Sequence, residues 1–502
     1  MRLHNVRGPA NALPGATRPG AITNATVTII DNEMPGNVDY EFRDPSQANP
    51  GADGPVYALG LQPDGMVVFG GDFTNVNGLL FNRISRLQSI GVVDPAFNPG
   101  FGADGTVYGV AVAPDDRIVL GGAFTRYNNT NRLGVARLNA NGGLDLSFDP
   151  GPGVSNGLVR VVAVQADRRV LIGGEFGLVG GLVRSNVGRL HTNGAVDTTF
   201  NAVANGAVFA LAVQPDQRIL VGGAFTRMNG AGYVSLCRLT TNGAIDTSFT
   251  AAAGLSGPVY GIAVQPDGRI VVGGAFTAGN GALLNLARLN TDGTLDTTFQ
   301  PGAGPLGAVN AVGVHPGGRI YIGGSFTHFN GTPRNGFARL LPTGALDTIF
   351  NPGSGANAPV RALAVQPDTA LLMGGDFTVV NELPRHRIAR IHGDEKSNLI
   401  GLGFAAPSFS VTESAGPARV TILRSGNTNA AFQITFATRG GTASNGVDYQ
   451  GFTNVVSFAP GQLSAEVTIP IFDDSLVEGN EIVGLVLENA PRLVELDPAT
   501  AT

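Results

Sequence analysis

Residues 259–276 read VYGIAVQPDGRIVVGGAF, and residues 286–299 read LARLNTDGTLDTTF. The first stretch joins two runs rich in β-branched residues through a Pro-Asp-Gly turn, and the second joins two further runs through a Thr-Asp-Gly turn. Short apolar runs separated by such turns are typical of antiparallel hairpins. The unit is therefore predicted to form four short strands within about 51 residues, the size and content of one blade of a β-propeller.

The same unit occurs seven times. Gly-Gly-x-Phe recurs at intervals of 49 to 52 residues, with its phenylalanines at Phe73, Phe124, Phe176, Phe225, Phe276, Phe326 and Phe377. An arginine follows the first glycine of each pair by sixteen residues, or by fifteen in one copy: Arg86, Arg137, Arg189, Arg238, Arg288, Arg339 and Arg390. The motif Asp-x-x-Phe begins eight residues after six of these arginines, at Asp94, Asp145, Asp197, Asp246, Asp296 and Asp347. The paired glycines are expected to let a strand pass close to its neighbours, where a Cβ atom would clash.

The ends of the repeat indicate a closed ring. The seventh unit ends at Arg390-Ile391 without an Asp-x-x-Phe, and the missing motif stands before the first unit, at Asp39-Tyr40-Glu41-Phe42. A ring whose last blade is completed by an N-terminal strand requires this stagger. Such a ring leaves no open sheet edge, whereas a linear solenoid would need end caps.

The repeat resembles the delta-60 repeat family, which has the pattern Q-P-D-G-(R/K)-I-x-V-G-G-x-F-T followed by A-R-L and D-x-x-F. The resemblance covers roughly residues 39 to 391. It implies a propeller from a large bacterial exported protein, and it implies little about biochemistry. A WD-type propeller is excluded because the chain has no tryptophan.

Residues 404–502 have a different character, with alternating strands such as ARVTILRSG, AFQITFAT and AEVTIPIFDD. This stretch resembles a Calx-beta domain, an immunoglobulin-like sandwich whose loops at one end bind calcium. The resemblance implies five ligands: Glu413, Asp448, Asp473, Asp474 and Glu478. Carboxylate oxygens suit calcium, which takes six to eight oxygen ligands. Ser475 stands where the family often has a third acidic residue, which should lower the affinity of the site.

The N-terminus resembles the tail of a preceding Calx-beta copy, through Leu3-His4-Asn5 and Ala25-Thr-Val-Thr-Ile-Ile-Asp31. The chain is accordingly interpreted as a fragment of a tandem array. Residues 1–34 are the remnant, 35–393 the propeller, 394–403 a linker, and 404–502 a sandwich lacking its last strand. A sharper hypothesis has the strand 25–31 dock onto this sandwich and supply Asp31 as a further ligand.

Composition narrows the function classes. The chain has 502 residues, a net charge of −6 and 14% charged residues, so its sequence does not show the excess of basic residues that is typical of nucleic-acid-binding proteins. Its single cysteine, Cys237, excludes an internal disulfide framework and is expected to be buried. No apolar run reaches the roughly 18 residues of a membrane span.

The repeated charges have structural interpretations. The aspartates of the Gln-Pro-Asp turns, Asp64, Asp216 and Asp267, are expected to accept backbone N–H groups. The repeated arginines and Asp-x-x-Phe aspartates are expected to pair, because catalysis normally uses one asymmetric constellation rather than seven copies. We expect no enzyme: neither a zinc-protease His motif nor a Gly-x-Ser-x-Gly nucleophile elbow occurs.

The sequence favours a non-catalytic, extracellular or cell-surface module for structure, adhesion or interaction, monomeric within a longer chain. Its expected cofactor is calcium, and its partner is an unspecified protein or glycan. Two alternatives stay open: a lectin-like propeller, disfavoured by the lack of tryptophan, and a propeller enzyme, which would need an acid–base cluster at the channel mouth.

Overall fold

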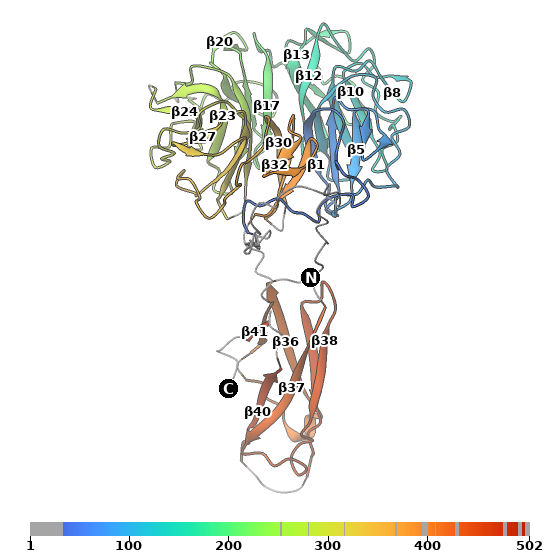
Figure 1. Cartoon of the computed structure of the whole chain (residues 1–502), viewed down its shortest axis with the longest axis vertical. Coiled ribbons are helices and arrows are strands. Elements are labelled where there is room, and N and C mark those ends of the chain that lie inside the picture. The colour runs from blue at the N-terminus through green and yellow to red at the C-terminus, as the bar shows by residue number, and fades with distance from the viewer. Residues whose placement is uncertain are drawn as a thin grey trace, which may run out of the picture.

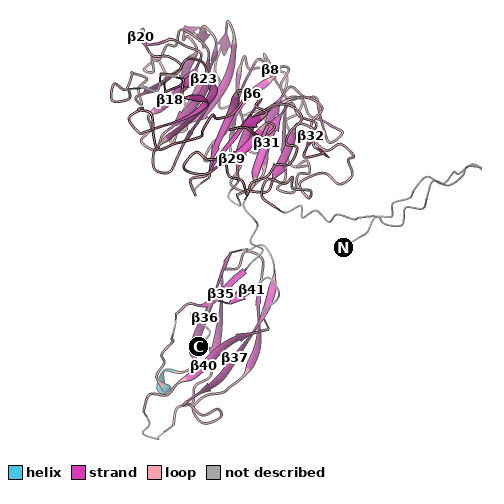
Figure 2. Ribbon diagram, turned by 60° about the vertical axis from the view of Figure 1, so that its left-hand side comes forward, coloured by secondary structure: helices cyan, strands magenta, loops and turns pink. Residues whose placement is uncertain are grey.

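The computed structural model describes residues 34–250, 254–279, 281–315, 317–366, 369–393, 400–406, 408–426, 431–474, 479–489 and 494–496. Within these ranges the chain is all-β apart from one short 3₁₀ helix (Figure 2). In the same ranges, no helix combines the length and the apolarity needed to cross a bilayer.

The described part of the first 393 residues contains seven blades, each an antiparallel sheet of three strands. The first strands are β1 (Val56–Leu61), β6 (Val107–Val112), β12 (Leu158–Val164), β17 (Val208–Val213), β22 (Val259–Val264), β25 (Val309–Val314) and β30 (Val360–Val365). The second strands are β2 (Val67–Gly71), β7 (Ile118–Gly122), β13 (Val170–Glu175), β18 (Ile219–Gly223), β23 (Ile270–Ala278), β26 (Ile320–Gly324) and β31 (Leu371–Gly375). The third strands are β5 (Ile84–Leu87), β10 (Val135–Leu138), β16 (Val187–Leu190), β21 (Leu236–Leu239), β24 (Leu283–Leu289), β29 (Phe337–Leu340) and β34 (Ile388–Ile391).

In most blades a short two-stranded hairpin lies between the second and third strands in the sequence. They are β3 (Asn75–Val76) with β4 (Leu79–Leu80), β8 (Arg126–Tyr127) with β9 (Thr130–Asn131), β14 (Leu178–Val179) with β15 (Leu182–Val183), β19 (Arg227–Met228) with β20 (Ala231–Gly232), β27 (His328–Phe329) with β28 (Thr332–Pro333), and β32 (Val379–Val380) with β33 (Leu383–Pro384). In the third blade, β11 (Val154–Ser155) also pairs with β14. In the fifth blade the residues of this hairpin belong to the longer strands β23 and β24, which pair with each other there.

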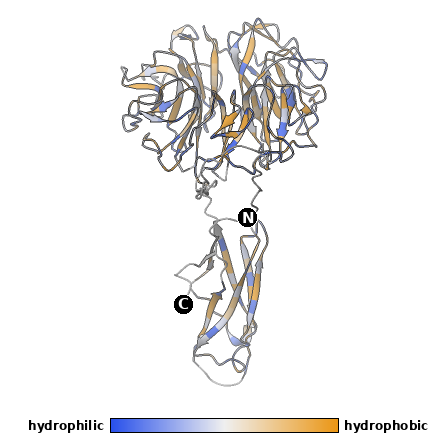
Figure 3. Cartoon of the chain, viewed as in Figure 1, coloured by the Kyte–Doolittle hydropathy of each residue, from blue (hydrophilic) through white to orange (hydrophobic). Residues whose placement is uncertain are grey.

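The first strands form the inner wall of a ring. Each contacts the first strand of the next blade, and β30 of the last blade contacts β1 of the first. Figure 1 shows β1 and β30 side by side near the axis. Apolar residues run along the strands of the blades (Figure 3). They form buried clusters between successive sheets, which hold the ring together.

The chain enters the last blade before it builds the first. Val38 forms an antiparallel bridge with Ile391, the last residue of β34. The amide of Asp39 donates a hydrogen bond of 2.8 Å to the carbonyl of Arg390. The predicted staggered closure and the seven-bladed propeller are therefore confirmed.

Residues 35–43, here called the closure segment, also contact both neighbouring blades. The amide of Asn351, at the end of the sixth blade, donates to the Pro35 carbonyl at 3.0 Å. The amide of Arg43 donates to the Ile90 carbonyl of the first blade at 3.1 Å. The segment thus connects the sixth, seventh and first blades.

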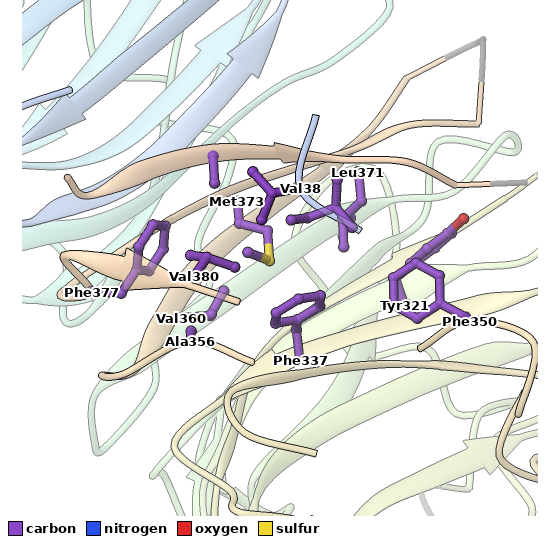
Figure 4. Close-up of a cluster of buried hydrophobic side chains, with 12 residues drawn as sticks. Val38, Tyr321, Phe337, Phe350, Ala356, Val360, Leu371, Met373, Phe377 and Val380 are labelled. Carbon is purple, nitrogen blue, oxygen red and sulfur yellow. The ribbon is translucent and has the colours of Figure 1, made fainter. Parts of the chain in front are cut away.

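Side chains of the closure segment complete two apolar clusters. Val38 is 1% exposed and packs in a cluster with Leu371 and Met373 of β31 (Figure 4). Phe42 is 4% exposed and lies in the next cluster, which contains Val56 of β1. The closure segment therefore contributes to the core on both sides of the last blade.

An arginine links each blade to the next, and Arg137 shows the pattern. Its Nε donates to Asp145 Oδ2 at 2.8 Å, and its Nη1 donates to the carbonyl of Thr192 in the following blade at 2.6 Å. Its guanidinium also lies 4.8 Å from the ring centroid of Phe148. We call this contact set the arginine clamp. It recurs at Arg86, Arg189, Arg238, Arg288 and Arg339.

In the last blade Arg390 pairs with Asp39 at 3.2 Å, so the closure segment supplies the aspartate. The predicted pairing of the repeated arginines and aspartates is therefore confirmed. Because the clamps are buried, each guanidinium and carboxylate depends on its partner for compensation of its charge.

The fourth strand of each blade is shorter than predicted. In the fifth blade a single bridge joins Leu289 to Leu295, and the chain then turns away. Asp296 causes the turn: its Oδ1 accepts the amide of Thr298, and its carbonyl accepts the amide of Phe299. The Asp-x-x-Phe motif is therefore a turn that follows one bridged residue, because the short Asp side chain competes for backbone donors.

The glycine pairs have the predicted steric role. A Cβ atom on Gly121 would lie 2.5 Å from the Val159 side chain of the next blade. A Cβ atom on Gly122 would lie 2.2 Å from the carbonyl oxygen of Thr106, in its own blade. Both distances are far inside van der Waals contact, so neither position tolerates a side chain.

The C-terminal region is a β-sandwich of two sheets. One sheet has the order β39 (Ser464–Ile469), β36 (Ala418–Gly426), β35 (Ile400–Phe404) and β41 (Val494–Leu496). The other has the order β38 (Thr453–Phe458), β37 (Phe432–Gly441) and β40 (Val483–Glu488). The core between them includes Ile422, Phe436 and Phe458.

The sandwich begins earlier than predicted. Strand β35 starts at Ile400, inside the segment 394–403 that was expected to be a linker. It pairs with β36 and β41, and its Leu402 is 1% exposed in the core. The apolar alternation of this strand is interrupted by glycines, which explains why the sequence suggested a linker. The predicted remnant at residues 1–34 falls almost wholly outside the described residues.

Candidate functional site

Three loops of the sandwich meet at one end, which we call the acidic end. Their described residues are 405–406 with 408–417, 442–452, and 470–474 with 479–482. The pairing of Ala418 with Ile469 places the start of β36 beside the end of β39. The pairing of Gly441 with Val483 places the end of β37 beside the start of β40. Since β35 follows residues 394–399 directly, the acidic end is the end away from the propeller connection.

Asp448 and Asp473 lie on loops that are joined through their backbones. Tyr449 bridges Ile471, and the amide of Phe472 donates to the Asp448 carbonyl at 2.8 Å. Asp473 therefore stands one residue beyond a direct contact with Asp448. The Asp448 carboxylate accepts the amide of Ser444 at 2.5 Å, which orients it within its own turn.

Glu413 opens the 3₁₀ helix η1 (Glu413–Ala415), shortly before β36 begins. Its side chain is exposed, as are those of Asp473 and Asp474, whereas Asp448 is half-buried. The structure thus brings these four predicted residues to one end of the sandwich. Glu478 and Asp31 lie outside the described residues.

The donor chemistry of the acidic end fits a hard cation. Exposed carboxylate oxygens on separate loops are the ligands that calcium prefers. Among the residues that the structure describes, no three His, Cys, Asp or Glu side chains are close enough together to hold a metal ion. The predicted site therefore depends on Glu478 and on backbone oxygens for its completion.

A second unusual geometry lies on the inner wall of the propeller. In the first blade Val56 pairs with Gly71 and Ala58 with Gly70, so Tyr57 is an extra residue that bulges out of the strand. Every first strand has the same β-bulge. The bulged residues, here called the axial ring, are Tyr57, Tyr108, Arg160, Phe209, Tyr260, Asn310 and Arg361.

Sequence comparison with known families agrees with the folds of both the propeller and the sandwich. Six repeats, at residues 62–97, 113–148, 165–200, 214–249, 265–299 and 315–350, match the β-propeller domain of unknown function DUF5122. Residues 395–502 match the Calx-beta domain. The chain carries DUF5122 propeller repeats and a Calx-beta domain. The families predicted from the sequence are thereby confirmed.

The Calx-beta domain is similar to parts of sodium/calcium exchangers. It is 29% identical over 111 residues to the exchanger Calx of Drosophila melanogaster, which is 22% of this chain and 12% of that protein. It is 35% identical over 94 residues to sodium/calcium exchanger 1 of Bos taurus, which is 18% of this chain and 10% of that protein. The chain thus spans about a tenth of the length of these relatives.

Two solved structures are also similar. The apo-form Calx CBD1 domain is 29% identical, with a TM-score of 0.20 over 20% of this chain and 88% of that one. The extracellular domain of the putative one-component system BT4673 from B. thetaiotaomicron is 12% identical, with a TM-score of 0.42 over 78% of this chain and 46% of that one.

Other residues of the DUF5122 propeller take the structural roles expected of them. Asp64, Asp216 and Asp267 accept the amides of residues two positions ahead, so they serve turns. Cys237 is fully buried, and burial raises the pKa of its thiol. The axial ring, in contrast, was not predicted. The sequence does mark its position: when the seven repeats are aligned on the first valine of VYGIAV, the residue after that valine varies. The rest of the motif repeats closely.

Proposed function

We propose that the Calx-beta domain binds calcium at its acidic end, through Glu413, Asp448, Asp473, Asp474 and Glu478. The observation that supports this most is the convergence of carboxylates from three loops at one end of the sandwich, with Asp448 half-buried and the others exposed. Calcium would supply a positive charge that neutralises these carboxylates and cross-links the loops. Asp448, held by the Ser444 amide, would present a preoriented oxygen.

The propeller is proposed to be a non-catalytic interaction module. Its most deeply buried charged groups are engaged in the arginine clamps, which repeat around the ring and hold blades together. A rigid ring beside a calcium-stiffened sandwich suits a structural or adhesive protein outside the cell. Extracellular calcium suits protein sites with dissociation constants of about 10⁻⁴–10⁻³ M.

Calcium is expected to raise the unfolding temperature of the sandwich and not that of the propeller. A ligand that binds only the folded state stabilises it by about 2.7 kcal/mol when its concentration is one hundred times the dissociation constant. Calorimetry of the whole chain in calcium chloride and in EGTA measures the shift. The double variant Asp448→Asn/Asp473→Asn should lose it.

A matched control is Glu466→Gln, which removes an exposed carboxylate on β39 that pairs with Arg419. This variant should keep the calcium shift, because exposed ion pairs contribute little. Identical unfolding of the unmodified chain in calcium and in EGTA would refute the calcium proposal.

A second candidate function is ligand binding by the propeller. The axial ring, with its aromatic side chains from four blades, is the specific observation that favours it.

A further inference from the structure

The seven bulges of the first strands place one side chain per blade beside the propeller axis. A β-bulge leaves its extra residue unpaired and re-aims the side chain, and bulges are over-represented next to functional sites. Among the described residues, no further strand lies on the axial side of the first strands, which form the innermost layer. Six of the ring side chains are half-buried there, and Arg361 is exposed.

Three neighbouring pairs of the axial ring are in contact. The rings of Tyr57 and Tyr108 lie 5.2 Å apart between centroids, and the guanidinium of Arg160 lies 4.6 Å above Tyr108. On the far arc, Phe209 and Tyr260 lie 5.4 Å apart. The ring thus presents two aromatic surfaces that are partly open to solvent.

Polar groups stand between the aromatic surfaces. Arg160 pairs with Glu175 at 2.9 Å, and Arg361 pairs with Asp376 at 2.7 Å. The two acids occupy the same repeat position, the variable residue of Gly-Gly-x-Phe. Burial and the nearby Asp376 raise the pKa of Tyr57.

The charges around the ring balance. A third acid at the same repeat position, Asp72, pairs with Arg83 at 3.2 Å. Three arginines therefore face three carboxylates, and each carboxylate has its own cation. Each of these described charges therefore already has a partner of the opposite sign, which favours a neutral ligand.

Folding does not dictate the identity of the ring residues. Asn310 and Arg361 occupy the same bulge as the tyrosines, in strands of the same register. Tyrosine and phenylalanine at four of the seven positions are consequently not a packing requirement of the blade. Their gathering around one axis calls for a ligand that uses aromatic faces.

We propose that the axial ring binds a neutral oligosaccharide. The aromatic faces would stack against the C–H faces of pyranose rings, which are apolar. The guanidinium–carboxylate pairs and the Asn310 amide would donate to and accept from the hydroxyl groups at the ring edges. This inference goes beyond the proposed calcium binding and does not depend on it.

The test is a titration with maltohexaose, cellohexaose and laminarihexaose, and with hexagalacturonate as an anionic probe. Because the chain has eight tyrosines and no tryptophan, tyrosine fluorescence reports binding near Tyr57, Tyr108 and Tyr260. At least one neutral hexasaccharide should bind saturably, more tightly than hexagalacturonate, and equally in calcium and in EGTA. A loss of saccharide binding in EGTA but not in calcium would count against this inference, while the calcium proposal would stand.

Two variants test the site itself. Tyr108→Asn copies the residue that the sixth blade carries at this bulge, so the fold should tolerate it, and binding should weaken about tenfold or more. Phe101→Ala removes an aromatic ring that is 67% exposed in a loop between blades, and it should leave the affinity unchanged. The inference is overturned if no neutral hexasaccharide binds, if only hexagalacturonate binds, or if Tyr108→Asn binds as tightly as the unmodified chain.

Discussion

Replacing Arg189 by methionine is expected to destabilise the propeller by about 3–5 kcal/mol, because it leaves a buried carboxylate without its cation. Arg189 Nε lies 2.8 Å from Asp197 Oδ2, and Asp197 is 0% exposed. Its Nη1 also donates to the Thr241 carbonyl of the next blade. The substitution therefore breaks one contact inside a blade and another between blades.

Asp197 stays charged at neutral pH, which makes the loss of its partner costly. Burial by itself would raise the pKa of this carboxyl group, but hydrogen bonds from Thr199 and Arg189 outweigh burial and lower the pKa to about 2. Methionine keeps the apolar stem of Arg189, so the expected loss reports the charge and the hydrogen bonds rather than a cavity.

Denaturant unfolding measures the effect. The double variant Arg189→Met/Asp197→Asn should recover part of the loss, because no charge is then left unpaired. The control Arg168→Met removes an arginine whose side chain is 58% exposed and that pairs weakly with Asp115 at 3.7 Å. It should cost about 0–1 kcal/mol. Equal small losses for Arg189→Met and Arg168→Met would refute the clamp as a buried ion pair.

Removal of residues 1–42 is expected to abolish the cooperative folding of the propeller. The truncation deletes Val38 and Phe42, and burial of such side chains is worth about 1.5–3 kcal/mol each. It also leaves Arg390 without Asp39 and uncovers the edge of β34. The combined loss approaches the whole stability of a typical domain, about 5–15 kcal/mol, and an exposed edge strand promotes aggregation.

The matched control removes residues 1–33 only and so retains the closure segment. This shorter truncation should unfold in a single propeller transition and remain monomeric in size-exclusion chromatography. The longer one should aggregate or lose that transition. If both truncations behave as the unmodified chain does, the closure segment is not needed for the ring.

The architecture of the propeller could be predicted because its repeat is explicit. Counting Asp-x-x-Phe against Gly-Gly-x-Phe showed that the ring must be closed by Asp39–Phe42, and the bridge from Val38 to Ile391 has that register. The fourth strand was overestimated, since strand propensity does not reveal that Asp296 diverts the backbone into a turn. Hydrogen bonding from one side chain decided the outcome there.

The axial ring could not be predicted from periodicity. Strict alternation along VYGIAV would place Tyr260 on the sheet face opposite Val259. The bulge between Val259 and Gly261 breaks that alternation and turns Tyr260 out of the ladder. A bulge depends on how the strand packs in the folded protein. Only the structure therefore shows that the variable residues of the seven repeats lie around one axis.

The acidic end illustrates the opposite case. Family resemblance identified its carboxylates, and the topology of the sandwich then placed Glu413, Asp448, Asp473 and Asp474 at one end. Spacing in the sequence could not have done so, because Glu413 and Asp473 are brought together only by the pairing of β36 with β39.

Oxidation of the double variant Val38→Cys/Ile391→Cys tests the closed ring most directly. The amide of Asp39 donates to Arg390 and that of His392 donates to Asn37, so positions 38 and 391 form a non-hydrogen-bonded pair. The Cα atoms of such a pair lie about 4.5 Å apart, within the range of a disulfide. The native chain should form an intramolecular disulfide that joins the peptides carrying positions 38 and 391 in a mass spectrum, while the buried Cys237 stays reduced. Free thiols at both positions, or disulfides only between chains, would show that the N-terminal strand does not close the last blade.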